Sequence, residues 1–222
     1  MSTKNNNAWI ILVVIIGIFS ISILSSVLSP TKRTLRKLKS AMDIQNPITR
    51  NFTLKLASQY PGEYNIDQVC KIYEHVNKNW KYVNDPRDID YYSKASYTIL
   101  NNLTGDCDDF AILIATAIES IGGKTRISYA FDSNSKIAHA FTEVYFNEDS
   151  NKIRERVNYY FQNFFEVLFE IPRVREISYS PDRARGLWLN LDWNSKYPGG
   201  PYFKYTSRII FYPRQNYFLK EK

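Results

Sequence analysis

The chain is poor in the residues that build metal sites and covalent scaffolds. Its 222 residues include two cysteines, Cys70 and Cys107, and two histidines, His75 and His139. Two cysteines cannot make a disulfide framework, and these four residues do not have the paired spacing of a structural zinc site. A disulfide-stapled fold and structural zinc are therefore excluded, and we expect neither a metal nor a cofactor.

Acidic residues are absent from the first 40 positions, where six Lys or Arg occur. Because the whole chain has a net charge of +7, residues 41–222 carry a net charge of only +1. A nucleic-acid-binding domain would spread its basic charge over the folded part, so we expect no nucleic-acid partner. Hydrophobic residues make up 44% and charged residues 23% of the chain, which excludes a disordered or coiled-coil protein.

One long stretch has no charge at all. From Ala8 to Leu28 the chain runs for 21 residues without a charged side chain. As a helix this run would span roughly 31 Å, which matches the hydrocarbon thickness of a bilayer. A cleaved signal peptide and a buried core helix are the alternatives, and we predict a transmembrane helix at about 8–28.

The charges around this run predict its orientation. Pro30 ends the apolar segment and a cluster of Lys and Arg follows, whereas only Lys4 precedes it. By the positive-inside rule, the basic flank and the domain after it stay on the cytoplasmic side. We therefore expect a single-pass membrane protein whose partners include membrane lipid.

The rest of the chain predicts one domain of the α+β class. Residues 1–29 hold the transmembrane segment, residues 30–64 form a basic juxtamembrane segment and a linker with a helical turn or two, and residues 65–222 form the domain. Periodicity places helices before strands, which is typical of α+β folds rather than parallel sheets. The predicted helices are 65–80 and 107–121, and the predicted strands are 126–131, 139–146, 187–193 and 208–212.

Residues 150–185 are predicted to be an insertion in this domain. Apolar residues from Ile153 to Phe169 have helical spacing, and the segment from Pro172 to Arg185 has the character of a loop. The apolar face of the helical part could pack on the core, cover the active site or enter the bilayer interface.

Cys107 stands at the first position of a helix that is apolar on nearly all sides. The unpaired N–H groups and partial positive charge at a helix start favour a thiolate, so we expect the pKa of Cys107 to fall below the free value of about 8.5. His139 lies near the start of a strand and Asp192 follows a later one, which gives a thiol, a base and an orienting carboxylate. Cys70 lies on an apolar helix face and is predicted to be a buried structural thiol.

Three short blocks of the sequence resemble the transglutaminase-like superfamily, and the resemblance covers about residues 66–212. It implies a papain-like transglutaminase core, in which the Cys-bearing helix packs on an antiparallel sheet. Cys107 would be the nucleophile, His139 the general base and acid, and Asp192 the residue that fixes the imidazole tautomer. The blocks are Gly105–Leu113, His139–Val144 and Trp188–Asp192.

The resemblance implies a cysteine peptidase or acyltransferase of the microbial transglutaminase-like type. Such an enzyme would act on protein or peptide amides through a thioester, with proteolysis, deamidation or transamidation as the outcome. The alternatives are a catalytically silent, membrane-anchored scaffold with the same fold and a lipid-binding or assembly factor. Trp80 and Trp188 are candidate substrate-binding residues, and core packing explains Trp80 equally well.

Three aspartates surround the predicted nucleophile. Asp106, Asp108 and Asp109 flank Cys107 at the start of its helix. Capping of the helix and pairing with its dipole is the interpretation we favour, and a calcium site is the alternative.

Overall fold

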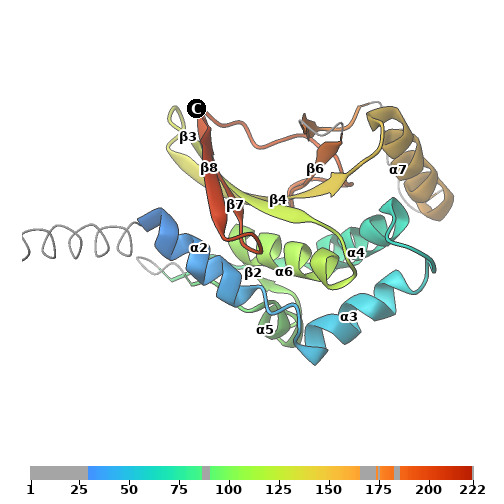
Figure 1. Ribbon diagram of the computed structural model, residues 1–222, viewed down its shortest axis with the longest axis horizontal. Coiled ribbons are helices and arrows are strands. Elements are labelled where there is room, and N and C mark those ends of the chain that lie inside the picture. The colour runs from blue at the N-terminus through green and yellow to red at the C-terminus, as the bar shows by residue number, and fades with distance from the viewer. Residues whose placement is uncertain (1–29, 87–90, 166–173, 175, 183–185, 222) are drawn as a thin grey trace, which may run out of the picture.

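The protein folds as an antiparallel sheet with most helices packed on one side (Figure 1). The computed structural model describes residues 30–86, 91–165, 174, 176–182 and 186–221. Six strands form one sheet in the order β5-β6-β4-β3-β7-β8, and every neighbouring pair is antiparallel. Its strands are β3 (Thr125–Asp132), β4 (Ile137–Phe146), β5 (Tyr179–Pro181), β6 (Leu187–Leu191), β7 (Ser207–Tyr212) and β8 (Tyr217–Glu221).

The helical layer and a small second sheet complete the architecture, which confirms the predicted α+β class. The short strands β1 (Lys81–Tyr82) and β2 (Thr104–Gly105) pair in parallel. The helices of the described residues are α2 (Pro30–Ala41), α3 (Pro47–Ala57), α4 (Ile66–Asn79), α5 (Ala95–Leu100), α6 (Cys107–Ser120) and α7 (Ser150–Phe165).

Helix α6 lies at the centre of the molecule, between the sheet and the other helices (Figure 1). Every residue from Asp108 to Ser120 is buried. The hydroxyl of Thr142 in β4 donates a hydrogen bond of 2.7 Å to the backbone carbonyl of Ala111, which ties the helix to the sheet. Burial of each large apolar side chain stabilises the fold by about 1.5–3 kcal/mol, so α6 holds its first residue, Cys107, in a fixed place.

Helix α4 begins where the sequence predicts. The Asn65 side chain accepts hydrogen bonds of 3.1 Å from the backbone N–H groups of Asp67 and Gln68. The Gln68 side chain accepts in return from the Asn65 N–H, which completes a capping box. Cys70 on the apolar face is fully buried, and burial raises its pKa well above the ordinary value. The predicted structural role of Cys70 is confirmed.

Residues 41–64 hold more structure than the linker that the sequence suggested. Helix α3 is capped by the Asn46 side chain, which accepts from the Ile48 N–H, and it begins at Pro47. Two of its buried residues are Thr49 and Thr53. Threonine is polar and does not count toward an apolar stripe, so the apolar periodicity did not predict this helix. The domain therefore includes helices from the segment before residue 65.

The structure also settles how the described part of the predicted insertion packs. In α7, Ile153 and Val157 are fully buried in the main core, and the Tyr160 hydroxyl donates a 2.8 Å hydrogen bond to Glu74 of α4. This apolar face therefore packs on the core. The rest of that helical pattern, residues 166–173, lies outside the described residues.

The predicted transmembrane helix at about 8–28 also lies outside the described residues. Within the part of the chain that the structure does describe, from Pro30 onward, none of the helices combines the length and the apolar character that a membrane span requires.

Candidate active site

Cys107 is the first residue of α6, and its position is fixed from both sides. The Asp106 side chain caps the helix by accepting a 3.1 Å hydrogen bond from the Asp108 N–H. On the other side, β2 ends at Gly105 and pairs with β1, where Tyr82 is the register partner of Gly105. A Cβ atom at Gly105 would collide with the Asp109 side chain, so this position requires glycine. The cysteine is partly exposed, as a reactive thiol must be.

The thiol of Cys107 is not activated by its helix position alone. Burial raises its pKa to about 12, and the charges of Asp106 and Asp108 add to this rise. Hydrogen bonds from the backbone N–H groups of Ala140 and of Cys107 itself lower the pKa, but burial outweighs them. The expectation that the helix start produces a thiolate was therefore wrong. Burial of the thiol and the nearby carboxylates raise its pKa more than the helix start lowers it. Catalysis by this thiol needs a base.

His139 and Asp192 lie together, as the three sequence blocks suggested. The Nε2 atom of His139 lies 2.9 Å from both carboxylate oxygens of Asp192. Both side chains are largely buried, at 10% and 2% exposure. Because a carboxylate only accepts hydrogen bonds, Nε2 carries the proton in this contact. A neutral His139 ring then has its lone pair on Nδ1, where it can accept a proton.

The sheet register brings Cys107 to the same place. Strand β6 pairs with β4 only from Thr142 to Phe146, so the first half of β4, with His139 and Ala140, has no β6 partner. At this open edge the Ala140 N–H donates to the Cys107 sulfur, and Cys107 packs against the cluster that contains Ala140. The thiol therefore lies beside the residue that follows His139.

Two residues that the sequence analysis did not identify hold Asp192 in place. The Tyr73 hydroxyl of α4 lies 2.6 Å from the carbonyl oxygen of Asp192 and 2.8 Å from that of Ser195. One helical turn later, the Asn77 side chain donates a 2.6 Å hydrogen bond to the Trp193 carbonyl. The signal in the sequence was weak: a tyrosine and an asparagine spaced four apart on an amphipathic helix.

The two tryptophans proposed for substrate binding lie in different surroundings. Trp80 packs edge-on against Phe110 of α6, with ring centroids 5.1 Å apart, and belongs to the rim of the main core. Trp188 is 8% exposed, donates its Nε1–H to Asp182 and stacks under the guanidinium of Arg126. The described contacts of Trp188 are thus on the outer face of the sheet, away from the Cys-bearing helix.

Tyr82 lies near the thiol, because its register partner is Gly105 and the Cys107 charge acts on its hydroxyl. Its ring packs against that of Trp193, with centroids 4.7 Å apart, and its side chain remains exposed. Burial, followed by the charges of Cys107 and Asp106, raises the pKa of Tyr82 to about 12. Tyr82 and Trp193 therefore form an aromatic pair that links the strand beside Cys107 to the segment after Asp192.

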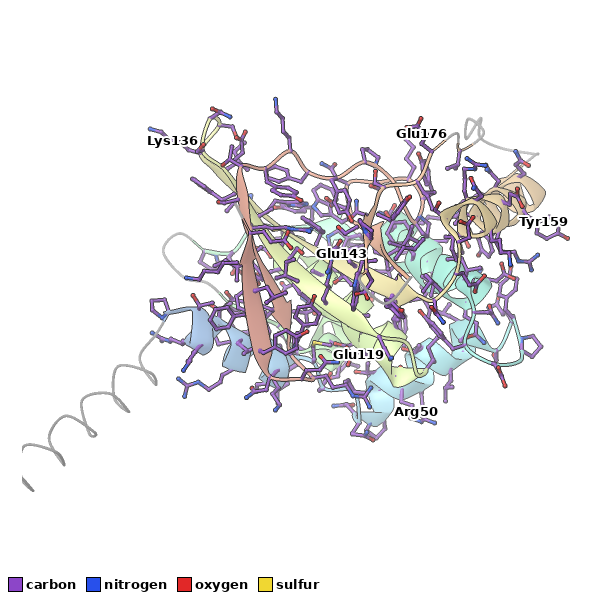
Figure 2. All side chains as sticks on the ribbon, turned by 45° about the horizontal axis from the view of Figure 1, so that its top comes forward. Arg50, Glu119, Lys136, Glu143, Tyr159 and Glu176 are labelled. Carbon is purple, nitrogen blue, oxygen red and sulfur yellow. The ribbon has the colours of Figure 1, made fainter. Side chains whose placement is uncertain are left out.

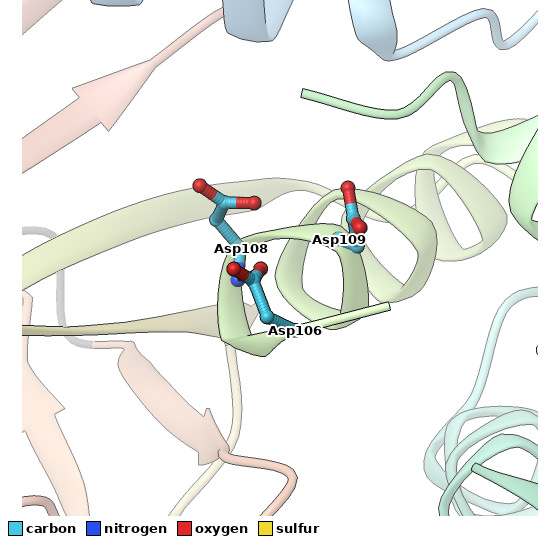
Figure 3. Close-up of side chains that lie close together, drawn as sticks. All are labelled: Asp106, Asp108 and Asp109. Carbon is cyan, nitrogen blue, oxygen red and sulfur yellow. Dashed lines mark hydrogen bonds between the residues drawn. The ribbon is translucent and has the colours of Figure 1, made fainter. Parts of the chain in front are cut away.

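The carboxylates of Asp106, Asp108 and Asp109 gather at the start of α6 (Figure 3). Ligand atoms of all three lie within 4.8 Å of one another, and carboxylate oxygens are the ligands that calcium prefers. Burial and then the Asp106 charge raise the pKa of Asp108 to about 9, and burial raises that of Asp109 to about 6. These groups could hold a cation, but two of them also serve the fold, since Asp106 caps α6 and Asp109 accepts from the Ser93 N–H at 2.8 Å.

A separate pocket lies at the opposite end of α6. Its volume is about 420 Å³, and its lining includes Lys39, Arg50, Glu119 and Arg214. Figure 2 labels Arg50 and Glu119, which lie near each other at that end. Because Cys107 is at the other end of α6, this pocket is not part of the candidate active site.

Comparison with solved structures finds several proteins with similar folds. LapG from Legionella pneumophila, treated with EGTA, is 18% identical, with a TM-score of 0.44 over 80% of this chain and 81% of that one. A candidate cysteine protease from Cytophaga hutchinsonii is 21% identical, with a TM-score of 0.35 over 43% of this chain and 32% of that one. The chain thus spans about a third of the length of the Cytophaga protein.

Comparison with curated proteins finds no match to this sequence. A family model, described as the transglutaminase-like superfamily, matches residues 38–153, which is just over half of the 222 residues. The matched range includes α6 with Cys107 and strand β4 with His139. On this match, the chain belongs to the transglutaminase-like superfamily.

Proposed function

We propose that the protein is a thiol enzyme that acts on protein or peptide amides through Cys107, His139 and Asp192. Membership of the transglutaminase-like superfamily supports enzymatic activity in general. The observation that carries the finer proposal is the 2.9 Å contact between His139 and Asp192 at the open edge of β4, where Cys107 also lies. This combination supplies a nucleophile, a base and a carboxylate that orients the base.

The first half of the reaction forms a thioester. His139 takes the proton from the Cys107 thiol at Nδ1 while the sulfur attacks the carbonyl carbon of the substrate amide. The C–N bond then breaks, and the leaving amine departs with the proton that His139 returns to it. Asp192 holds the other ring nitrogen and stabilises the imidazolium between these steps. The raised thiol pKa makes this transfer to His139 necessary.

The second half determines the product. When water attacks the thioester, its proton passes to His139, the C–S bond breaks and the thiol is restored. The product is a cleaved chain if the amide was a peptide bond, and a glutamate if it was a glutamine side chain. An amine in place of water gives transamidation. We favour hydrolysis, since the proposal needs no second substrate for it.

Mass spectrometry of a mixed peptide pool tests this proposal. We expect the full-length protein to convert peptides, and the mass change distinguishes cleavage, deamidation and amine incorporation. Cys107→Ala should abolish turnover, and Asp192→Asn should lower the rate by about 100-fold or more, because the His139 tautomer is no longer fixed. Cys70→Ala is the matched control, because it removes the other cysteine from a site that is fully buried.

Three outcomes would contradict the proposal in whole or in part. Turnover that survives in Cys107→Ala would exclude the cysteine as nucleophile. Absence of any peptide conversion by the wild-type protein would favour the silent scaffold. Unchanged turnover in Asp192→Asn would leave a cysteine enzyme but remove Asp192 from its machinery.

We also propose that the enzyme is anchored to a membrane by residues 8–28, with the domain on the cytoplasmic side. Helix α2 supports this arrangement, because its Leu35 and Leu38 are buried in the domain while Lys32 and Arg33 are exposed. A basic outer face suits anionic lipid headgroups. Carbonate extraction should leave the protein in the membrane fraction, and protease added to intact cells should not reach the domain. Release by carbonate would refute the anchor, and digestion in intact cells would refute the orientation.

A further inference from the structure

The segment Tyr197–Phe203, here called the strap, follows Asp192 and runs from the main core, where Tyr197 packs, to the outer face of β4, where Tyr202 packs on Phe141. The Asn190 side chain in β6 donates hydrogen bonds to the carbonyls of Gly200 and Pro201, at 3.0 and 3.2 Å. The Gly199 N–H donates a 2.7 Å hydrogen bond to the backbone carbonyl of Asn190. The backbone of the strap is therefore tied to β6 at several points.

The far end of the strap is anchored to a buried carboxylate. The Tyr202 hydroxyl donates a 2.6 Å hydrogen bond to Glu143 of β4, which is fully buried and lies at the middle of the sheet (Figure 2). Arg126 holds the same carboxylate with two hydrogen bonds of 2.8 and 2.9 Å. The Tyr202 ring also packs on Phe141, with centroids 5.5 Å apart. Glu143 is thus a rigid fixed point for Tyr202.

The next residue of the strap meets the candidate base. The Phe203 ring lies over the His139 ring, with centroids 5.0 Å apart and planes inclined by 48°. Phe141 approaches the same imidazole at 6.2 Å. His139 and Glu143 are four residues apart on one strand face, so the anchor and the covered ring belong to the same element. Phe203 therefore covers the His139–Asp192 pair where the sheet edge is open.

We propose that Phe203 is a positioning residue for His139, held in place by the hydrogen bond from Tyr202 to Glu143. This inference rests on the proposed function, in which the Nδ1 of His139 must face Cys107. Asp192 fixes the position of Nε2, but the ring could still rotate about that contact. An aromatic ring against the imidazole face restricts this rotation and keeps water away from the proton between Nε2 and the carboxylate.

Nuclear magnetic resonance of the full-length protein with labelled histidine tests the positioning directly. The chain has only two histidines, so His75→Gln assigns the His139 signals. In the wild type we expect a single tautomer, with Nε2 protonated and its proton exchanging slowly with water. In Phe203→Ala we expect exchange up to about tenfold faster and a second tautomer, since an aromatic contact is worth up to about 1.5 kcal/mol.

Matched variants separate positioning from general loss of structure. Phe203→Leu keeps an apolar cover and should restore slow exchange, whereas Tyr202→Phe removes only the hydroxyl and should change the His139 signals in the direction of Phe203→Ala. Phe218→Ala removes a ring on β8, three strands away from β4 in the sheet, where it packs on Phe211, and it should leave the His139 signals unchanged. In the peptide assay, Phe203→Ala should lower kcat more than it alters KM, because the substrate does not need to touch this ring.

The outcomes distinguish this inference from the proposed function. Unchanged tautomer and proton exchange in Phe203→Ala would overturn it, and so would an equal change in Phe218→Ala. If the wild type converts no peptide but the histidine signals respond as expected, the proposed function fails while the positioning stands.

Discussion

The buried carboxylate of Glu143 gives the sharpest test of what holds this fold together. It is fully buried and lies 2.8 Å from Arg126 and 3.4 Å from Arg208, which are themselves 6% and 5% exposed. Burial alone would raise the pKa of Glu143, but the charge and hydrogen bonds of Arg126, followed by the charge of Arg208, hold it below its ordinary value. Glu143→Gln keeps the size of the side chain, removes the charge and replaces one of the two acceptor oxygens by an NH2 donor.

We expect Glu143→Gln to destabilise the folded protein, because it leaves the two buried guanidinium groups without their shared counter-ion. Loss of one partner from a buried ion pair destabilises a protein by about 3–5 kcal/mol. For a domain of this size, each kcal/mol lowers the melting temperature by about 2–4 °C, so the fall should be about 6–20 °C. Thermal unfolding followed by circular dichroism measures this difference.

A matched variant tests the role of burial. Glu221→Gln removes the other carboxylate partner of Arg208, whose side chain is 46% exposed, and should cost no more than about 1 kcal/mol. The pH dependence has a defined sign. Because the folded pKa of Glu143 is lowered, its contribution is complete above the unfolded pKa of about 4.3 and is lost as pH falls through the folded value. A change in melting temperature as small for Glu143→Gln as for Glu221→Gln would refute this reasoning.

Two further predictions concern the start of α6. Since the pKa of Asp108 is raised to about 9, the folded state binds more protons than the unfolded state above about pH 4, and stability should fall as pH rises through this window. Asp108→Asn should flatten that fall in melting-temperature profiles, and the exposed control Glu176→Gln should not. Iodoacetamide should label Cys107 in the native protein but label Cys70 only after unfolding. The alkylation rate in His139→Ala should keep rising beyond pH 9, because burial raises the pKa of Cys107 to about 12 and no base is left to take its proton, and a plateau near the free-thiol pKa of about 8.5 would contradict this.

Several elements followed directly from short stretches of sequence. Asn65 and the apolar periodicity after it predicted α4, and the apolar run after Cys107 predicted α6, because caps and periodicity act within one or two helical turns. The alternation of residues likewise predicted the strands at 126–131 and 139–146, which form β3 and β4. These features depend on neighbours along the chain, so the sequence alone was enough.

Two other elements could not be predicted from a local pattern. Strand β8 is mostly exposed at the edge of the sheet, and its residues do not alternate between apolar and polar. Helix α3 turns Thr49 and Thr53 toward the core. Both elements are stabilised by contacts with distant parts of the chain. Strand β8 depends on hydrogen bonds to β7, and α3 depends on packing against the domain.

The candidate site also has some features that the sequence predicts and others that it does not. The sequence by itself determined that Cys107 starts a helix and that a histidine and an aspartate follow in strand-like segments. Only the tertiary structure decided that His139 Nε2 meets Asp192, that the Tyr73 hydroxyl bonds to the Asp192 carbonyl, that Phe203 packs on the His139 ring, and that burial raises the thiol pKa. A helix start is a local property, whereas desolvation and contacts between strands sum over atoms from many distant segments, which no short window of sequence contains.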